Sequence, residues 1–527
     1  MAMMRQWAGL LLCMFWMAGG YLAWAQQSEQ QASLDPSGLT LITVLQSTLD
    51  NHPVLHLQEE QVTIERAVTQ QATGRFDTVL ASGVSQSRFN TSLTTAAQSA
   101  TSLTNPIRNQ ATNLTNYDFT ASKLFRNGMT GGFLVETTRT ADNVVNDFGL
   151  NRSRLSFEVN VPLLRGRGRD VVTAQESAAD LEAEAALFDL NQVIAELLSN
   201  STSRYWFHVA AIRTLDVLEN SETRGTTYVE NVQALIDADQ IAPIEINQVQ
   251  ANLADRTTSR IAAQQRVIES EQGLALAMGL SAGRMAALPE PQDPMPAVKQ
   301  QTAVDTSVAA IESLMERAIE SRADILAARK RQDSAQTISG AAENLTKPQL
   351  DLTFSSGYSG FKEGRRIDRW VSAVVSGVRG VDAVAGVRYE FPPSNNFARG
   401  RQSEAIAAVR QADFRYQETA RNVTSEVSAS LQAVRFAISR VSKARESVEF
   451  SQTALEGERE KLRLGLGSLV DLLTIEDRLT NSLLNLVDAE LAYALALTRL
   501  RFATGTIVAP DQAVQTVDQN IFYELPF

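Results

Sequence analysis

The chain reads VSASLQAVRFAISRVSKARESVEFSQTALEGEREKL from Val427 to Leu462. Every seventh residue of this stretch is apolar: Val427, Val434, Val441, Val448, Leu455 and Leu462. After Gly465 the pattern resumes at Leu472, Leu479, Leu486, Tyr493 and Leu500. A strict seven-residue repeat predicts long helices that supercoil with a left hand around their neighbours. Such helices are too long for an ordinary globular domain and indicate a rod or a tube.

The rest of the chain indicates a duplication. Residues 51–55 (NHPVL) correspond to residues 321–325 (SRADI) at an offset of 270. Asp239 corresponds to Gly465 and Gly279 to Gly505, both at an offset of 226. The spacing from Asp239 to Gly279 therefore equals that from Gly465 to Gly505, 40 residues. A unit that recurs in the same order predicts one pseudo-symmetric body rather than several unrelated domains.

Each half has the same expected order: an opening helix, a strand-rich stretch and two long helices. The opening helices are expected at 39–73 and 308–344. Residues 170–239 are expected to form one helix, roughly 100 Å long at about 1.5 Å per residue. We predict these divisions: a signal peptide at 1–25, a linker at 26–38, a first repeat at 39–285, a Pro-rich linker at 286–306, a second repeat at 307–508 and a tail at 509–527.

Strands are predicted by alternation of apolar and polar residues. The predicted strand residues are Leu155, Phe157, Val159 and Val161 in the first half, and Leu350, Leu352, Phe354, Val387, Tyr389 and Phe391 in the second. The first half carries 41 more residues than the second between its strand landmarks. This surplus, within an insert at 90–150, includes a polar loop at 90–116 and a hairpin that turns at Asn127-Gly128. It either adds strands or only enlarges an outer loop.

The start of the chain is typical of an exported protein. Arg5, an apolar run from Trp7 to Trp24 and the small residues Ala23 and Ala25 predict a cleaved signal peptide. A retained anchor helix is the alternative, although no stop-transfer charges follow. The only cysteine, Cys13, lies inside the apolar run, so the mature chain has no disulfide framework. A net charge of −12 without long basic tracts argues against a nucleic-acid partner.

Four stretches resemble the TolC-like outer membrane efflux proteins. They are the opening helix with its NHP motif at 51–53, the strand exit VPLLRGRG at 161–168, the segment KLRLGLGSLVDLL at 461–473 and the closing LRFATG at 500–505. Their order, duplication and equal spacing carry the resemblance over residues 39–508. The chain departs from the family in three places: Asp239 stands where the second half has Gly465, the insert enlarges the strand region, and the exit PPSNN at 392–396 is polar.

The resemblance implies a fold that is mainly α with a transmembrane β-barrel portion. Three copies would each give four strands to one twelve-stranded barrel, continued by a coiled-coil tunnel in the periplasm. Four strands cannot close a barrel alone, and unpaired edges in lipid are costly, so an oligomer is required independently. The apolar strand residues would face lipid, while Glu158, Asn160 and Glu390 would face the lumen.

The turns between the long helices are the expected functional sites. The resemblance makes them the contact for a periplasmic adaptor that links the channel to an inner-membrane pump. The tip residues are Asp239, Gln240, Ile241, Ala242 and Pro243 in the first half and Gly465, Leu466, Gly467 and Ser468 in the second. Glycine suits the left-handed turn that ends a helix.

An acidic residue follows each tip by six positions, Glu245 in the first half and Asp471 in the second. Threefold symmetry would gather three Asp471 carboxylates into a cation-attracting ring at the entrance. The alternative is that an acid in the first turn simply stabilises the helix dipole.

Other side chains carry little functional signal. His52 and His56 lack a third metal ligand, and His208 beside Trp206 is typical of a helix interface. Trp370, Tyr358 and Phe361 are either an interfacial aromatic girdle or core residues. The alternation of Tyr523, Leu525 and Phe527 weakly resembles a barrel-assembly signal.

The sequence therefore predicts a channel-tunnel that exports small molecules or proteins within a tripartite efflux or type I secretion system. It predicts no enzyme, cofactor or metal site, because no catalytic cluster is recognisable. One alternative is an exported helical scaffold without transport activity. A hydrolase on a helical body is another, but it would need the missing cluster.

Overall fold

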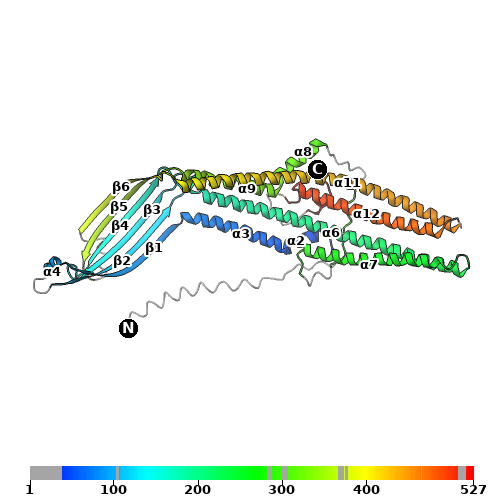
Figure 1. The fold of residues 1–527 in the computed structure, drawn as a ribbon, viewed down its shortest axis with the longest axis horizontal. Coiled ribbons are helices and arrows are strands. Elements are labelled where there is room, and N and C mark those ends of the chain that lie inside the picture. The colour runs from blue at the N-terminus through cyan, green and yellow to red at the C-terminus, as the bar shows by residue number, and fades with distance from the viewer. Residues whose placement is uncertain are drawn as a thin grey trace, which may run out of the picture.

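The computed structural model describes residues 38–101, 106–281, 288–298, 307–365, 373, 378–464, 466–508 and 518–526. The molecule is elongated, with a sheet at one end and long helices that run to the opposite end (Figure 1). The predicted signal peptide at 1–25, the linker residues up to 37, Trp370, Gly465 and Phe527 lie outside the described residues. Among the described helices, none combines the length and apolarity needed to cross a bilayer.

The opening helices are each broken in two, so the prediction of two continuous helices was wrong. In the first half they are α2 (Leu41–Asn51) and α3 (Pro53–Thr73); in the second, α8 (Val308–Ser321) and α9 (Ala323–Leu345). His52 between the first pair has an extended backbone, because the ring of Pro53 disfavours a helical conformation before it. Arg322 breaks the second pair at the equivalent position, with ψ of 128°.

The landmark glycines of the duplication pack against these breaks. Gly279 and Gly505 have φ of +72° and +66°. A Cβ on Gly279 would lie 2.6 Å from the carbonyl oxygen of Asn51, and one on Gly505 would lie 3.0 Å from Cγ of Arg322. Each repeat therefore ends in a left-handed turn pressed onto its own broken helix, which explains why both landmarks recur together.

The long helices run without interruption over most of their expected length. They are α6 (Ala174–Asp237), α7 (Glu245–Ala277), α11 (Asn396–Arg463) and α12 (Leu469–Ala503). The predicted helix at 170–239 is divided at Thr173, so that α5 (Arg169–Val172) precedes α6. The heptad residues Val427, Val434, Val441 and Leu455 of α11 are buried, as a supercoiled seam requires.

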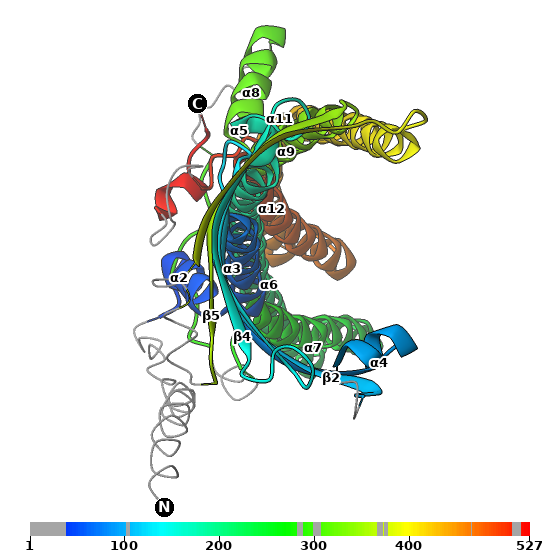
Figure 2. The same cartoon turned by 90° about the vertical axis from the view of Figure 1, so that its left-hand side faces the viewer.

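The helices enclose two main apolar clusters. One surrounds Tyr205 and Trp206 of α6 and includes residues of α2, the end of α7 and Phe522 of the tail. The other joins the heptad residues of α11 to α8, α9 and α12. Viewed from the sheet end, the elements form an arc with α11 and α7 toward its opposite ends (Figure 2).

The sheet has six strands in the described residues, not the four expected. They are β1 (Thr78–Ser92), β2 (Asn109–Leu124), β3 (Thr130–Asp142), β4 (Leu150–Pro162), β5 (Gln349–Glu363) and β6 (Val378–Glu390). All neighbours are antiparallel and follow one another in chain order. The predicted hairpin at Asn127-Gly128 joins β2 to β3, so the insert adds two full strands.

The polar segment at 90–116 is also more ordered than the predicted loop. It contains the end of β1, the short helix α4 (Thr95–Thr101) and the start of β2. Thr and Asn residues of β2 pair with β1 through backbone hydrogen bonds, whatever their side chains. The amino-acid composition alone was therefore a poor guide here, because backbone pairing does not require apolar side chains.

Candidate functional site at the helical tips

The turn between α6 and α7 is closed by backbone hydrogen bonds. Asp239 has φ of +52°, the left-handed conformation that glycine normally adopts. The amide of Asp239 donates to Ile236 O at 2.9 Å, and the amide of Gln240 donates to Leu235 O at 2.9 Å. These two bonds form a Schellman motif, which satisfies carbonyl groups at the end of α6.

The turn between α11 and α12 contains the same outer hydrogen bond of a Schellman motif, which spans five residues. The amide of Leu466 donates to Lys461 O at 2.9 Å, 226 residues after the bond from Gln240 to Leu235. Gly467 approaches Leu462 so closely that a Cβ would lie 3.0 Å from its backbone nitrogen. Ser468 begins α12, and its hydroxyl accepts a hydrogen bond from the amide of Asp471. Gly467 and Ser468 therefore have clear structural roles in this turn.

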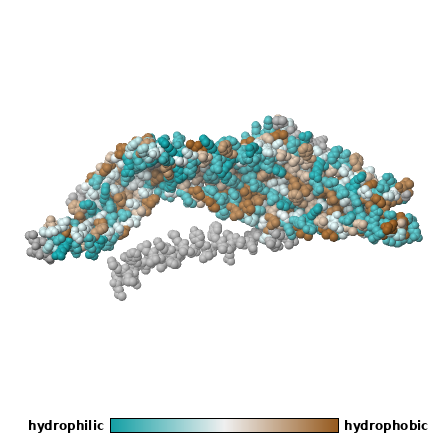
Figure 3. Space-filling model, in the orientation of Figure 1, coloured by the Kyte–Doolittle hydropathy of each residue, from teal (hydrophilic) through white to brown (hydrophobic). Residues whose placement is uncertain are grey.

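Apolar side chains gather on the outside of both tips. Ile244, Leu464, Leu466 and Val470 are exposed, and Leu466 has the highest exposed fraction, 79%. Brown apolar surface is visible at this end of the molecule (Figure 3). Ile241, by contrast, packs inward with Val232, Val249 and Leu473 and links the two tips. The extreme end thus offers an apolar surface that this chain does not itself cover.

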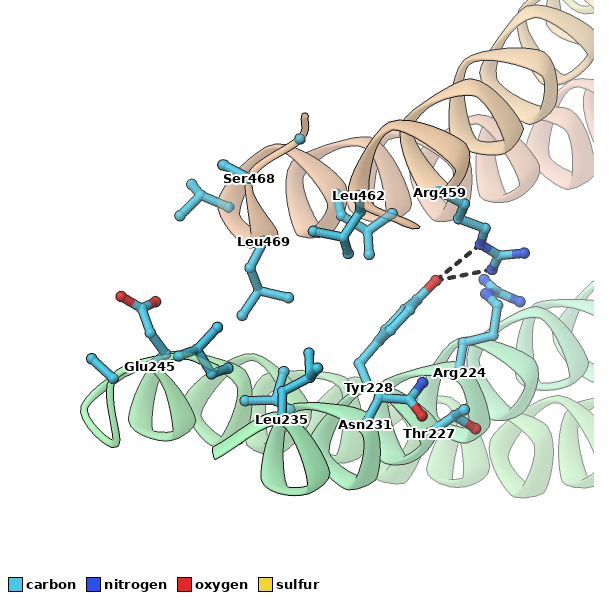
Figure 4. Close-up of a pocket in the computed structure, with 16 residues that line it drawn as sticks. Arg224, Thr227, Tyr228, Asn231, Leu235, Glu245, Arg459, Leu462, Ser468 and Leu469 are labelled. Atoms are coloured by element: carbon cyan, nitrogen blue, oxygen red, sulfur yellow. Dashed lines mark hydrogen bonds between the residues drawn. The ribbon is translucent and has the colours of Figure 1, made fainter. Parts of the chain in front are cut away.

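A cavity of about 770 Å³ lies between the two tips, just inside this surface. Its walls come from α6, α7, α11 and α12 and include Tyr228, Leu235, Glu245, Leu462 and Leu469 (Figure 4). Tyr228 projects from α6 across the gap toward Arg459 of α11. The cavity is therefore mostly apolar at the outer end, where Glu245 also lies, and is bounded by further charged groups at the inner end.

Those charged groups meet at Glu476 of α12, whose side chain is fully buried. One carboxylate oxygen accepts from Tyr228 Oη at 2.6 Å and from Arg459 Nη2 at 2.8 Å; the other accepts from Arg224 Nε at 2.9 Å. Arg459 also donates to Tyr228 Oη at 2.9 Å. We call Glu476, Tyr228, Arg224 and Arg459 the tip network; it joins α6 of the first repeat to α11 and α12 of the second.

The tip network alters the acidity of its members. Burial alone would raise the pKa of Glu476, but the hydrogen bonds from Tyr228 and Arg224 hold that pKa below its usual range. Burial and the hydrogen bond to Glu476 raise the pKa of Tyr228 to about 12. At neutral pH the network therefore contains a carboxylate, a neutral phenol and two guanidinium groups.

A second polar cluster lies next to the tip network along α12. Arg256 of α7 is buried and donates from Nη2 to Asp477 Oδ1 at 2.9 Å. The same guanidinium donates from Nη1 to Ser221 O at 3.0 Å, and the Ser221 hydroxyl lies 3.2 Å from that of Thr480. Charged hydrogen bonds therefore fasten α12 to both helices of the first repeat.

The predicted acidic residues take different positions. Asp471 is exposed in the first turn of α12, whereas Glu245 begins α7 and lines the cavity between the tips. The placement of Asp471 is compatible with both interpretations, an entrance ring and a helix-dipole contact.

The predicted strand residues lie in strands, with one exception. Leu155, Phe157, Val159 and Val161 are in β4, Leu350, Leu352 and Phe354 in β5, and Val387 and Tyr389 in β6. Phe391 follows the last residue of β6 and is not part of the sheet. Pro392 comes next and has no amide hydrogen for the ladder, which explains the end of the strand there.

The remaining candidate residues have structural partners. His52 Nδ1 accepts from the Val54 amide, His56 Nδ1 lies 3.1 Å from Glu59, and His208 Nδ1 lies 2.9 Å from Ser270 Oγ. Tyr358 pairs with Leu155, but Phe361 pairs with Arg152 on the other face, so the two cannot share one girdle. Tyr523 packs on Trp206 and Leu525 on the α11 cluster, so the tail lies on the helices.

Comparisons with known proteins agree with this architecture. Residues 314–506 match the sequence profile of the family described as "Outer membrane efflux protein". Most of the second repeat is therefore similar to an outer membrane efflux protein. No curated protein matches the chain.

The fold extends this similarity beyond the matched repeat. The Campylobacter jejuni CmeC outer membrane channel is 15% identical, covers 93% of this chain and 92% of its own, and superposes with a TM-score of 0.63. The Vibrio cholerae outer membrane protein VceC is 18% identical and has a TM-score of 0.61; the match covers 88% of this chain and 96% of VceC. The open-state MtrE channel of Neisseria gonorrhoeae is 15% identical with a TM-score of 0.60, over 88% of both chains.

These findings confirm the predicted family resemblance and the predicted fold class of long helices joined to an antiparallel sheet. The outer membrane efflux proteins are channels of the outer membrane rather than enzymes, and the match of residues 314–506 supports an outer-membrane location for this chain. The tip network is the feature that sequence reasoning missed. A signal was present, because Glu476 is a charged residue beside the buried heptad positions Leu472 and Leu479.

Proposed function

We propose that three copies of this chain form an outer-membrane channel-tunnel that serves a tripartite efflux or type I secretion system. The observation that carries the proposal is the amphipathic sheet, continued by long helices, in which β1 and β6 each have one edge without a strand partner in the described part of the chain. An apolar sheet face in lipid needs closure, because unpaired backbone groups in a bilayer are costly. Additional copies of the chain supply that closure, and energy for export comes from an inner-membrane pump rather than from a reaction in this chain.

Exposed apolar stripes on the helices support a ring of copies. Phe414, Phe436 and Phe450 of α11 are all about two-thirds exposed. Roughly six helical turns separate the first two and about four separate the last two, so the three side chains lie on a similar side of the helix. At the other end of the arc, Ile261 and Ile268 of α7 are exposed and seven residues apart, as are Leu57 and Ile64 of α3. The aromatic stripe of one copy would pack on the aliphatic stripes of the next. Such a head-to-tail contact closes into a ring.

The tips are the proposed contact for the periplasmic adaptor. The turns that join α6 to α7 and α11 to α12 lie at the end of the molecule opposite the sheet (Figure 1). The proposed contact residues are Asp239, Gln240, Ile241 and Pro243 of the first turn and Gly465, Leu466, Gly467 and Ser468 of the second. The exposed apolar residues beside them, such as Ile244 and Val470, support a protein partner there. Threefold symmetry would bring the three Asp471 carboxylates, with Glu245 behind them, to the entrance.

The tip network is proposed to hold the entrance closed. Opening the tip would require the hairpin of α11 and α12 to separate from that of α6 and α7. Such separation would break the bonds from Tyr228 and Arg224 to Glu476 and leave a buried carboxylate with fewer partners. Adaptor binding to the exposed tips would supply the free energy for that step.

Planar-bilayer recording of the detergent-extracted protein tests the proposal. A threefold assembly with discrete channel currents is the expected result. A water-soluble monomer without channels, even when the acids at the tip are neutralised, would support the alternative of an exported scaffold.

The acidic entrance is tested separately by Asp471→Asn. If three carboxylates form a ring, the variant should lose much of its preference for cations over anions, because the fixed negative charge is removed. Reversal potentials under a salt gradient measure that preference. Asp255→Asn, an exposed acid on α7 away from the tip, is the control. An Asp471→Asn channel with unaltered selectivity would leave only the helix-dipole interpretation.

A further inference from the structure

The inserted hairpin of β2 and β3 lies inside the sheet rather than at its edge. Residues 78–92 of β1 pair with residues 109–123 of β2 along their whole length. On its other side, β2 pairs with β3 from Thr112 to Leu124, and β3 continues the pairing to β4. A flap or plug would leave at least one of these edges free. The six strands instead form one continuous curved sheet (Figures 1 and 2).

One face of the sheet is apolar across the middle of the inserted strands as well, with Lys123 and Arg139 on the same face toward the strand ends. Directly opposed residues of an antiparallel pair lie on the same face. One cross-strand row therefore contains Phe119 of β2, Val135 of β3, Leu155 of β4, Tyr358 of β5 and Val381 of β6. In the next row, the rings of Phe133 and Phe157 lie 4.9 Å apart. β2 and β3 thus continue the surface that the other strands present to lipid.

The opposite face is polar through the same strands. Asp118 of β2 opposes Glu136 of β3, which in turn opposes Arg154 of β4. Carboxylates on this face come from β2 to β6, namely Asp118, Glu136, Glu158, Asp351 and Asp382, and the strand arginines beside them are Arg152, Arg154 and Arg388. Strands with one apolar and one charged face are typical of the wall of a water-filled membrane barrel.

The free edges allow the sheet to close with other copies. β1 and β6 are the two edges, and consecutive antiparallel strands make these two run in opposite directions. The β6 edge of one copy can therefore pair antiparallel with the β1 edge of the next. Six strands from each of three copies give eighteen, in place of the twelve expected from four strands each.

We infer that the outer-membrane pore of this protein is an eighteen-stranded barrel whose wall includes β2 and β3. This inference rests on the proposed trimer. Barrel diameter grows roughly linearly with strand number, so the pore is about one and a half times as wide as a twelve-stranded one, and barrels of about 16–18 strands leave an aqueous channel. The exit therefore suits bulky, hydrated solutes, neutral or cationic given the excess of carboxylates, and leaves size selection to the helical tips.

Paired cysteine substitutions test whether β2 and β3 form the wall. In a Cys13→Ser background the chain has no other thiol. Asp118→Cys and Phe119→Cys on β2, and Glu136→Cys and Val135→Cys on β3, probe the two faces. Arg154→Cys and Leu155→Cys on β4, in the same cross-strand rows, are the matched controls. Each variant in outer-membrane vesicles is treated with a charged, water-soluble maleimide.

All three polar-face cysteines should react, and all three apolar-face cysteines should be protected by lipid. If both faces of β2 and β3 react while the β4 pair alternates, the inserted strands lie in water and the inference is wrong, although the channel proposal stands. If the β4 pair also fails to alternate, the sheet does not span the membrane and the proposed function itself fails.

Pore width is tested by deletion of residues 93–142, which removes β2 and β3 and leaves four strands in each copy. Neutral polymers of increasing size, added at the barrel side, should reduce single-channel current up to a larger size for the intact protein than for the deletion. An equal size limit in an assembled deletion channel would overturn the inference. If the deletion variant does not assemble, the maleimide labelling pattern alone shows whether β2 and β3 belong to the barrel wall.

Discussion

Glu476 is the single residue on which the helical tip most depends. It is fully buried on α12, and its carboxylate accepts hydrogen bonds from two other helices: from Tyr228 and Arg224 on α6 and from Arg459 on α11. Each hydrogen bond to a charged group typically contributes about 1.5–3 kcal/mol. Arg459 is half exposed, so its share is smaller because water screens it.

We expect Glu476→Gln to destabilise the helical end by about 1–3 kcal/mol, because the side chain keeps its size but loses the charge that pairs with Arg224. The midpoint of thermal unfolding, followed by the helical circular dichroism signal, measures the change. The same variant should conduct more in its resting state if the network holds the tip closed. Glu460→Gln is the control, since its pair with Arg463 is exposed, and no change is expected there. An unfolding midpoint that does not move would contradict a structural role for the carboxylate.

The depressed pKa of Glu476 predicts a pH dependence with a definite sign. The folded pKa lies below the ordinary value of about 4.3, so between the two values the unfolded chain binds more protons. The contribution of Glu476 is therefore complete above about pH 4.3 and is lost as pH falls through the folded pKa. Unfolding midpoints of wild type and Glu476→Gln should converge as the pH is lowered through this window. A constant difference at all acidic pH values would contradict this assignment.

Among the elements, the same arrangement occurs once in each repeat: a glycine in a left-handed turn packs against the break in the opening helix. His52 and Arg322 interrupt the opening helices, and Gly279 and Gly505 press on these breaks. In the second repeat, Arg322 is also held by Asp324 and Glu426. Proline explains the first break locally, whereas the second break has no proline and coincides with these charged contacts of Arg322.

Gly279→Ala should destabilise the protein by at least about 1 kcal/mol, because an alanine at positive φ is strained and its Cβ would overlap the backbone of Asn51. Gly340→Ala, in the open interior of α9 with nothing within 4 Å of the added carbon, is the matched control. That control should stabilise by about 0.5–1 kcal/mol through helix propensity. Thermal unfolding of both variants gives the comparison, and equal effects would show that the close approach at Gly279 is not required.

At the scale of the whole molecule, the arc of elements is incomplete in one chain. The exposed phenylalanines of α11 and the exposed aliphatic residues of α3 and α7 are at its two ends, and the sheet edges β1 and β6 are free of partners within the described residues. The helical part and the sheet therefore both have surfaces suited to a neighbouring copy on the same two sides of the molecule, the side of α11 and β6 and the side of α3, α7 and β1. One rotation can satisfy both, which is why a closed ring is the simplest assembly.

Phe436→Glu should weaken this ring, because a charge would be placed in the apolar contact between copies. The assembly state in detergent, measured by light scattering after size exclusion, should shift toward the monomer. Val145→Glu is the control: Val145 is 79% exposed, in the loop between β3 and β4, away from the helical stripes. A trimer of unchanged stability for Phe436→Glu would place the contact between copies elsewhere.

Short-range patterns in the chain were enough to predict several features of the fold. The heptad at Val427, Val434 and Val441 predicted the long supercoiled helices, because side chains seven residues apart fall on one face. The alternation at Leu155, Phe157 and Val159 predicted a strand in the same way. The recurrence of Gly279 and Gly505 predicted the duplication, since a left-handed turn strongly restricts the residue that can occupy it.

The tip network and the number of strands depend on contacts between distant parts of the chain. Glu476 meets Tyr228 and Arg224 across 248 and 252 residues of chain, and no local pattern predicts which distant side chain will face a buried carboxylate. The polar strand β2 gains its place from backbone pairing with β1 and β3, which a single strand's sequence does not specify. Periodicity fixes which face of an element is apolar; which elements meet is set by packing over the whole chain.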